Sequence, residues 1–134
     1  MPRTATIRIV ASSVTEASAA GTVRNQVEII CDLRVDYPHK SSHVPGTVNV
    51  VGNVNCTAPV SAIYMAVGLA RNGSLVSVTN YSNSGQASLR GNTATACVNG
   101  AYQGVESVTV VFPPGFTPPT ASGTALSPGV SIVC

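Results

Sequence analysis

Two runs of alternating apolar residues, joined by a short turn signal, dominate the middle of this sequence. The runs span residues 62–70 and 75–81, and both favour β-strands because successive side chains of a strand face opposite sides of a sheet. Between them lies Asn72-Gly73, a pair that accepts the positive φ angles of a type I′ turn. The twist of that turn matches paired antiparallel strands, so the sequence predicts a β-hairpin here.

Further alternating segments flank the hairpin and predict an all-β domain. Expected turns include Gly91-Asn92, and residues 116–127 are Pro-, Thr- and Ser-rich and are expected to be extended. Short strands separated by turns are typical of a sandwich or barrel, and we expect an immunoglobulin-like antiparallel β-sandwich, although the chain lacks the core Trp of true immunoglobulin domains. The other expected strands are residues 4–11, 26–35, 47–56, 86–90, 93–98, 101–112 and 129–134.

The composition excludes two classes of partner. Charged residues make up only 9% of the 134 residues, but no apolar run approaches the roughly 18 residues that a membrane-spanning helix needs. The net charge of +2 and the scattered Arg residues argue against nucleic-acid binding. We therefore expect no membrane span and no nucleic-acid partner.

The four cysteines predict two disulfides. An even count without a Cys-x-x-Cys pair favours disulfides and an oxidising compartment, and these cysteines are too widely spaced for a typical zinc site. Three pairings are possible. We favour Cys31–Cys56, because both fall in phase with the apolar faces of their strands, and Cys97–Cys134, because they are neighbours in sequence. The protein is therefore expected to be secreted.

The N-terminal region has two interpretations. Residues 4–11 alternate like a strand, whereas residues 12–25 are rich in Ser, Ala, Thr and Gly and suggest a linker. The strand is either the first strand of the sandwich or an arm that pairs with another subunit's sheet through main-chain hydrogen bonds. We expect an arm and linker at residues 1–25 before a disulfide-tied sandwich at 26–134, so that deletion of residues 1–20 leaves a folded domain. The candidate partner-binding residues are Thr4, Ala5, Thr6, Ile7, Arg8, Ile9 and Val10.

No motif predicts a metal or nucleophilic site. His39 and His43 lie in a Pro-bounded loop, where their spacing fixes no geometry, and Asp36 would be the nearest third ligand. No local context resembles the nucleophile elbow of a serine hydrolase. We therefore expect no metal, no cofactor and no catalytic residue.

The carboxylates do not suggest an acid–base pair. Glu28 and Asp32 share a strand face, but four residues of strand separate them by roughly 13 Å, which exceeds the spacing of glycosidase carboxylates. Glu106 falls in phase with Val108 and Val110 and is expected to be half-buried. The six aromatic residues form no evident platform for a sugar.

The closing half of the chain resembles small secreted proteins of Streptomyces and related actinobacteria. The resemblance covers residues 26–134 and is carried by segment 97–104 (CVNGAYQG), segment 110–119 (VVFPPGFTPP) and the terminal Cys134. The layout of an arm before a disulfide-tied β-domain is similar to the small linker subunit of umbrella toxin particles. That subunit joins a lectin-bearing subunit to a large spoke-and-stalk subunit through an extended N-terminal segment.

The expected function is therefore a binding role rather than catalysis. The resemblance implies a non-enzymatic secreted adaptor that joins other protein subunits of an extracellular bacterial assembly such as an antibacterial toxin particle, with residues 4–10 docking as a strand. The alternative is a stand-alone secreted protease inhibitor or carbohydrate-binding module.

Overall fold

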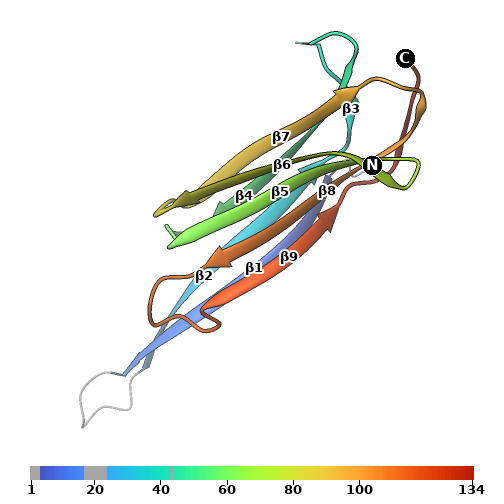
Figure 1. Cartoon of the computed structure of the whole chain (residues 1–134). Coiled ribbons are helices and arrows are strands. Elements are labelled where there is room, and N and C mark those ends of the chain that lie inside the picture. Colours follow the sequence, from blue (N-terminus) through green and yellow to red (C-terminus); the bar gives the residue numbers. More distant parts are fainter. Residues whose placement is uncertain (1–3, 17–23, 43) are drawn as a thin grey trace.

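Ten β-strands make up the ordered framework of the protein. The computed structural model describes residues 4–16, 24–42 and 44–134, and these residues contain no helix. Two antiparallel sheets of five strands each lie face to face (Figure 1). The strands are β1 (Thr4–Glu16), β2 (Arg24–Asp36), β3 (His39–Lys40), β4 (Thr47–Cys56), β5 (Ala62–Arg71), β6 (Ser74–Ser84), β7 (Ser88–Ala96), β8 (Gly100–Val111), β9 (Thr120–Leu126) and β10 (Val130–Ile132).

Each sheet has a short strand that prolongs a longer one. In the first sheet, which we call sheet A, β2 and then β3 pair with one side of β4, β7 pairs with the other side, and β1 adds to β2. In the second sheet, sheet B, β5 lies between β6 and β8, and both β9 and β10 pair with the far side of β8. The edge strands are therefore β1, β3 and β7 in sheet A, and β6, β9 and β10 in sheet B.

The sequence predictions hold for the sandwich and for its central hairpin. Asn72 and Gly73 have φ angles of 52° and 84°, the positive values that the predicted β5–β6 turn requires. The inner faces of the two sheets supply a single core that is built from the apolar sides of β2, β4, β5 and β8. The all-β, two-sheet architecture is confirmed, whereas the immunoglobulin-like topology stays a prediction.

Three predicted boundaries differ from the structure. β7 runs unbroken through Gly91, where a turn was expected. Residues 120–126 form a strand, β9, in the segment that was expected to be extended but was not counted among the strands, because β8 offers them a full antiparallel ladder. Two residues of the expected loop, His39 and Lys40, pair with β4 as β3.

Gly91 is needed for packing rather than for a turn. A Cβ atom at this position would overlap the ring of Tyr81, which reaches from β6 to β7. The Tyr81 hydroxyl donates to the main-chain oxygen of Asn92 at 2.7 Å and accepts from the Asn92 amide at 3.1 Å. This tyrosine therefore joins sheet B to sheet A at the β6–β7 edge.

Gly91→Ala is expected to destabilise the protein by about 1–3 kcal/mol, because the added methyl group overpacks the Tyr81 ring. Chemical denaturation of the variant measures this cost. In a Tyr81→Ala background the same substitution should cost much less, since the ring is gone. An equal cost of Gly91→Ala in both backgrounds would show that the ring contact is not the cause.

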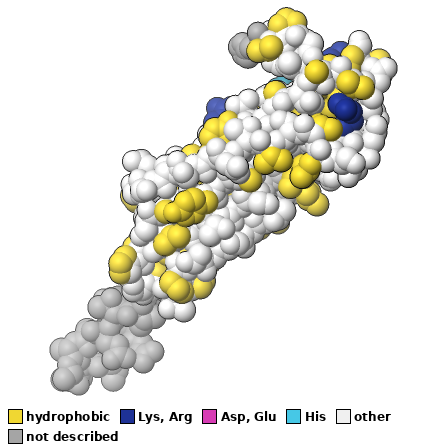
Figure 2. All heavy atoms as spheres, in the orientation of Figure 1, with side chains coloured by type: hydrophobic (Ala, Val, Ile, Leu, Met, Phe, Trp, Pro, Cys, Tyr) yellow, Lys and Arg dark blue, Asp and Glu magenta, His cyan; other side chains and the backbone are white. Residues whose placement is uncertain are grey.

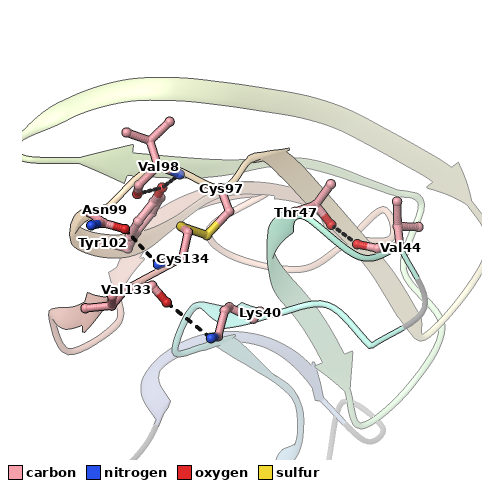
Figure 3. The surroundings of a disulfide bond; sticks show 9 residues. All are labelled: Lys40, Val44, Thr47, Cys97, Val98, Asn99, Tyr102, Val133 and Cys134. Atoms are coloured by element: carbon pink, nitrogen blue, oxygen red, sulfur yellow. Dashed lines mark hydrogen bonds between the residues drawn. A yellow bond between two sulfur atoms is a disulfide. The ribbon is translucent and has the colours of Figure 1, made fainter.

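Both predicted disulfides are present. Cys31 and Cys56 are directly opposite each other on β2 and β4, so this bond joins neighbouring strands of sheet A. Cys97 follows β7 and Cys134 follows β10, so the second bond joins the two sheets at one end (Figure 3). Neither bond links the central strands of opposite sheets, as the disulfide of antibody domains does.

Hydrogen bonds reinforce the end of the sandwich around the second disulfide. The Asn99 side-chain oxygen accepts from the Cys134 amide at 2.7 Å, and the Lys40 ammonium donates to the main-chain oxygen of Val133 at 3.1 Å (Figure 3). The buried Tyr102 donates its hydroxyl proton to the Val98 carbonyl at 2.6 Å. The C-terminal residues are thus fixed to the body of the domain.

Candidate functional site

The predicted docking segment forms one edge of sheet A. β1 pairs with β2 of the same chain along its whole length, from Thr4 opposite Asp36 to Glu16 opposite Arg24. All seven candidate docking residues, 4–10, therefore lie in a strand of the sandwich. The strands also extend beyond their expected ends: residues 12–16 and 24–25, assigned to a linker, continue the ladder. Residues 17–23 of that linker lie outside the described part of the chain.

The side chains of β1 divide between the core and the surface. Ile9 and Ala11 point inward and are buried in the core. Ile7 belongs to the same face but is 39% exposed, and Val10, on the opposite face, is 41% exposed. β1 therefore contributes to its own fold and also shows two large apolar side chains to solvent.

The hydrogen bonds of Ser12 reveal which main-chain groups of β1 point away from β2. Ser12 donates to the Thr117 carbonyl at 2.9 Å and accepts from the Thr117 amide at 2.8 Å, outside the ladder with β2. Both main-chain polar groups of a residue in an antiparallel strand point to the same side, and this side alternates along the strand. The amides and carbonyls of Thr6, Arg8 and Val10 therefore point outward, and within the described residues they have no main-chain partner.

An ion pair lies on the outer surface of β1 and β2, beside this edge. Arg8 Nε donates to Asp32 Oδ1 at 2.9 Å, and Asp32 lies on the neighbouring strand β2. The hydrogen bond and the charge of Asp32 raise the pKa of the Arg8 guanidinium above its usual value. Both side chains are solvent-exposed, so the pair adds little stability, but it places charge beside an open strand edge, where charge discourages indiscriminate pairing.

Glu106 is a carboxylate enclosed in the core of the sandwich. Its side chain is 0% exposed, which goes beyond the half-burial that its phase predicted. It extends from β8 toward β4, where Gly52 leaves room: a Cβ at position 52 would lie 2.7 Å from Glu106 Oε1. Neither carboxyl oxygen forms a hydrogen bond of good geometry with the described residues.

The enclosure favours the neutral form of this carboxyl group. Burial raises the pKa of Glu106 to about 8, the main-chain groups of Asn53 and Arg34 oppose that change, and the negative charge of Asp36 adds to it. A raised carboxyl pKa is common in active sites. Here, however, Glu106 is buried in the core and lines neither of the two surface depressions described next.

Two shallow depressions mark the surface. The larger, of about 440 Å³, lies on the outer face of sheet B and spans β6, β5, β8 and β9 around Tyr64. The smaller, of about 380 Å³, lies beside Tyr81 and Arg90. Each depression is lined by residues that strand pairing brings together from separate parts of the chain, so the sequence alone gave no signal for either.

The other sequence candidates are not brought together. His39 lies exposed on β3, and His43 falls outside the described residues. Across residues 4–16, 24–42 and 44–134, no three His, Cys, Asp or Glu side chains are grouped so as to hold a metal ion. In this part of the chain there is no helix of the length and apolar character that could span a membrane.

The chain has no recognisable relative in three comparisons. No family model matches it, and no curated protein or solved structure matches it either. The candidate site therefore rests on geometry, and the feature that sequence and structure share is the β1 edge.

Proposed function

We propose that this protein is a non-enzymatic, secreted adaptor that joins other protein subunits of an extracellular bacterial assembly through the outer edge of β1. The observation that carries the proposal is the open strand edge, where Thr6, Arg8 and Val10 direct main-chain groups to solvent. A strand of a partner can add to such an edge through main-chain hydrogen bonds. The sequence resemblance to the umbrella toxin linker suggests the same role, although β1 pairs with its own domain instead of forming a free arm.

The side chains of the edge would supply specificity. Main-chain hydrogen bonds contribute about 0.5–1.5 kcal/mol each and are the same for any strand. Ile7 and Val10, both part-exposed on opposite faces, offer apolar contacts to alternate side chains of a partner strand. Arg8 and Asp32 offer a charged pair beside them. A fitting partner therefore presents an extended segment with apolar residues on both faces.

The disulfides support an extracellular setting. All four cysteines are paired, and such bonds persist in oxidising compartments such as the bacterial cell exterior. The proposed adaptor is thus a disulfide-linked domain that exposes the outer edge of β1.

Blocking the outward amides of β1 tests the proposal. Thr6→Pro and Val10→Pro each remove an amide that points to solvent, so the ladder with β2 keeps its hydrogen bonds. The tagged protein would be isolated from the culture medium of the cells that secrete it, and co-purifying subunits would be quantified by mass spectrometry. We expect the double proline variant to recover its main partner at least about tenfold less well than wild type.

The matched control is Thr6→Ala with Val10→Ala, which alters the same side chains and keeps both amides. It should recover more partner than the proline variant, and both variants should unfold at similar temperatures. Undiminished recovery by a folded proline variant would contradict strand docking at β1. Wild-type protein that is isolated only as a monomer without partners would contradict the adaptor role.

A further inference from the structure

The outer face of sheet B carries two rows of uncharged polar side chains. Strand register brings Tyr64 on β5 beside Ser82, Thr109 and Ser122 of the neighbouring strands. Two residues further along β5, the next row contains Asn80, Ala66, Ser107 and Thr124. The depression of about 440 Å³ lies over these two rows and crosses all four strands.

An apolar row forms the next line of side chains on this face. Val78 and Leu126 are exposed there, on either side of Gly68 and Val105. No residue that lines the depression is charged. In Figure 2 the hydrophobic patches are separated by white areas of uncharged side chains and backbone, Lys and Arg appear in the upper half of the view, and no acidic side chain is visible.

Tyr64 is an exposed aromatic residue on this face of sheet B. Its side chain is 53% exposed. Its hydroxyl forms no hydrogen bond within the described residues, whereas the hydroxyls of Tyr81 and Tyr102 bond to main-chain carbonyls. An exposed ring with a free hydroxyl suits a ligand that has both an apolar face and polar edges.

The hydroxyl pairs beside Tyr64 keep spare hydrogen-bonding capacity. Thr109 and Ser122 lie 2.8 Å apart, and Ser107 and Thr124 lie 3.5 Å apart, measured between their hydroxyl oxygens. Each hydroxyl carries one donor and two acceptor sites, so a pair that shares one proton still has a donor and several lone pairs to offer. The side-chain amide of Asn80 adds a further donor and acceptor at the β6 end of the row.

We propose that this face binds an uncharged glycan laid across the strands, with a sugar ring stacked on Tyr64. A pyranose ring has an apolar face for the tyrosine and hydroxyl groups for the rows of Ser, Thr and Asn. The absence of charged lining residues disfavours phosphorylated, sulfated or uronic-acid ligands, which need cationic partners. The three inter-strand steps from β6 to β9 give the trough a length of about 14 Å, enough for a short run of sugars.

The shallow form of the site predicts weak binding by one copy. An adaptor held in an assembly would present several such faces, and avidity would then raise the strength of attachment to a polysaccharide surface. This glycan site lies on sheet B, away from the β1 edge of sheet A, so the two proposals concern separate surfaces.

Titration with neutral hexasaccharides tests the inference. Cellohexaose, maltohexaose and chitohexaose would be titrated into the full chain, with an oligogalacturonate as the charged comparison. The chain has no Trp, so tyrosine fluorescence reports on the site alongside calorimetry. We expect at least one neutral hexasaccharide to bind and the oligogalacturonate not to bind. Tyr64→Ala should weaken binding by about tenfold, whereas Tyr64→Phe, which keeps the ring, should weaken it by less than about threefold.

The control variant is Val10→Ala, on the outer face of sheet A, which should bind the hexasaccharide as wild type does. Unchanged unfolding temperatures would show that Tyr64→Ala acts at the surface, and its unchanged recovery of protein partners would separate this site from the β1 edge. The proposal is overturned if no neutral hexasaccharide binds wild type, or if Tyr64→Ala binds equally well. It is also overturned if sedimentation shows that Tyr64 instead holds two copies together.

Discussion

Glu106→Gln is expected to stabilise the protein by about 3 kcal/mol at neutral pH and to flatten its stability profile between pH 4.5 and pH 8. Burial raises the pKa of this carboxyl from 4.5 to about 8, and each unit corresponds to about 1.4 kcal/mol. Below pH 4.5 the carboxyl is protonated in both the folded and the unfolded chain. Above it the unfolded chain releases the proton first, so the stability of wild type falls as the pH rises, until the folded form also ionises near pH 8.

Denaturant unfolding from pH 4 to pH 9 measures this difference. Gln has nearly the same shape as a neutral Glu, so the two proteins should have similar stability at pH 4 and diverge as the pH rises. Glu28→Gln is the matched control, since Glu28 is exposed on β2, and it should follow wild type throughout. Parallel curves for Glu106→Gln and wild type would show that Glu106 is not held neutral by the core.

Ile9→Asp is expected to unfold the protein or to destabilise it by at least about 4 kcal/mol. The substitution removes a buried apolar side chain, worth about 1.5–3 kcal/mol, and places an unpaired carboxylate in the core. Val10→Asp changes the next residue of the same strand, which faces solvent, and should cost less than about 1 kcal/mol. Thermal unfolding of the two variants separates a core strand from a detachable arm.

Deletion of residues 1–16 should have the same consequence as Ile9→Asp. The sequence favoured a folded domain after such a truncation, but β1 supplies a 13-residue ladder to β2 and buries Ile9 and Ala11. We now expect the truncated chain to be unfolded or strongly destabilised. A truncated protein that unfolds at the wild-type temperature would instead support an arm that contributes nothing to its own domain.

Local signals in the sequence predicted the hairpin and the disulfides well. The Asn72-Gly73 turn depends on the backbone preferences of two residues. Cys31 and Cys56 each fall in phase with the apolar residues of their own strand, which is visible without knowing the fold. Gly91 was misread because a glycine that makes room for a distant ring looks the same in sequence as a glycine in a turn. β9 was missed because its residues are small and weakly patterned, and its pairing with β8 depends on the whole sheet.

The candidate sites likewise depend partly on local sequence signals and partly on contacts that only the whole fold creates. Alternation placed residues 4–10 in a strand, but it gave no means of telling that β2 of the same chain would pair with them. The phase of Glu106 predicted partial burial, whereas full burial depends on the space that Gly52 leaves on the opposite sheet. The rows around Tyr64 exist only through the register of four strands, so no local pattern could reveal them.

Amide hydrogen exchange along β1, read residue by residue with NMR, tests strand docking most directly. In the free protein the amides of Ile7, Ile9 and Ala11, which face β2, should exchange slowly, and those of Thr6, Arg8 and Val10 should exchange fast. In complex with the co-purified partner, the second set should become protected as a partner strand pairs with it. Amides of Thr6, Arg8 and Val10 that exchange equally fast in the free and the complexed protein would contradict docking at this edge.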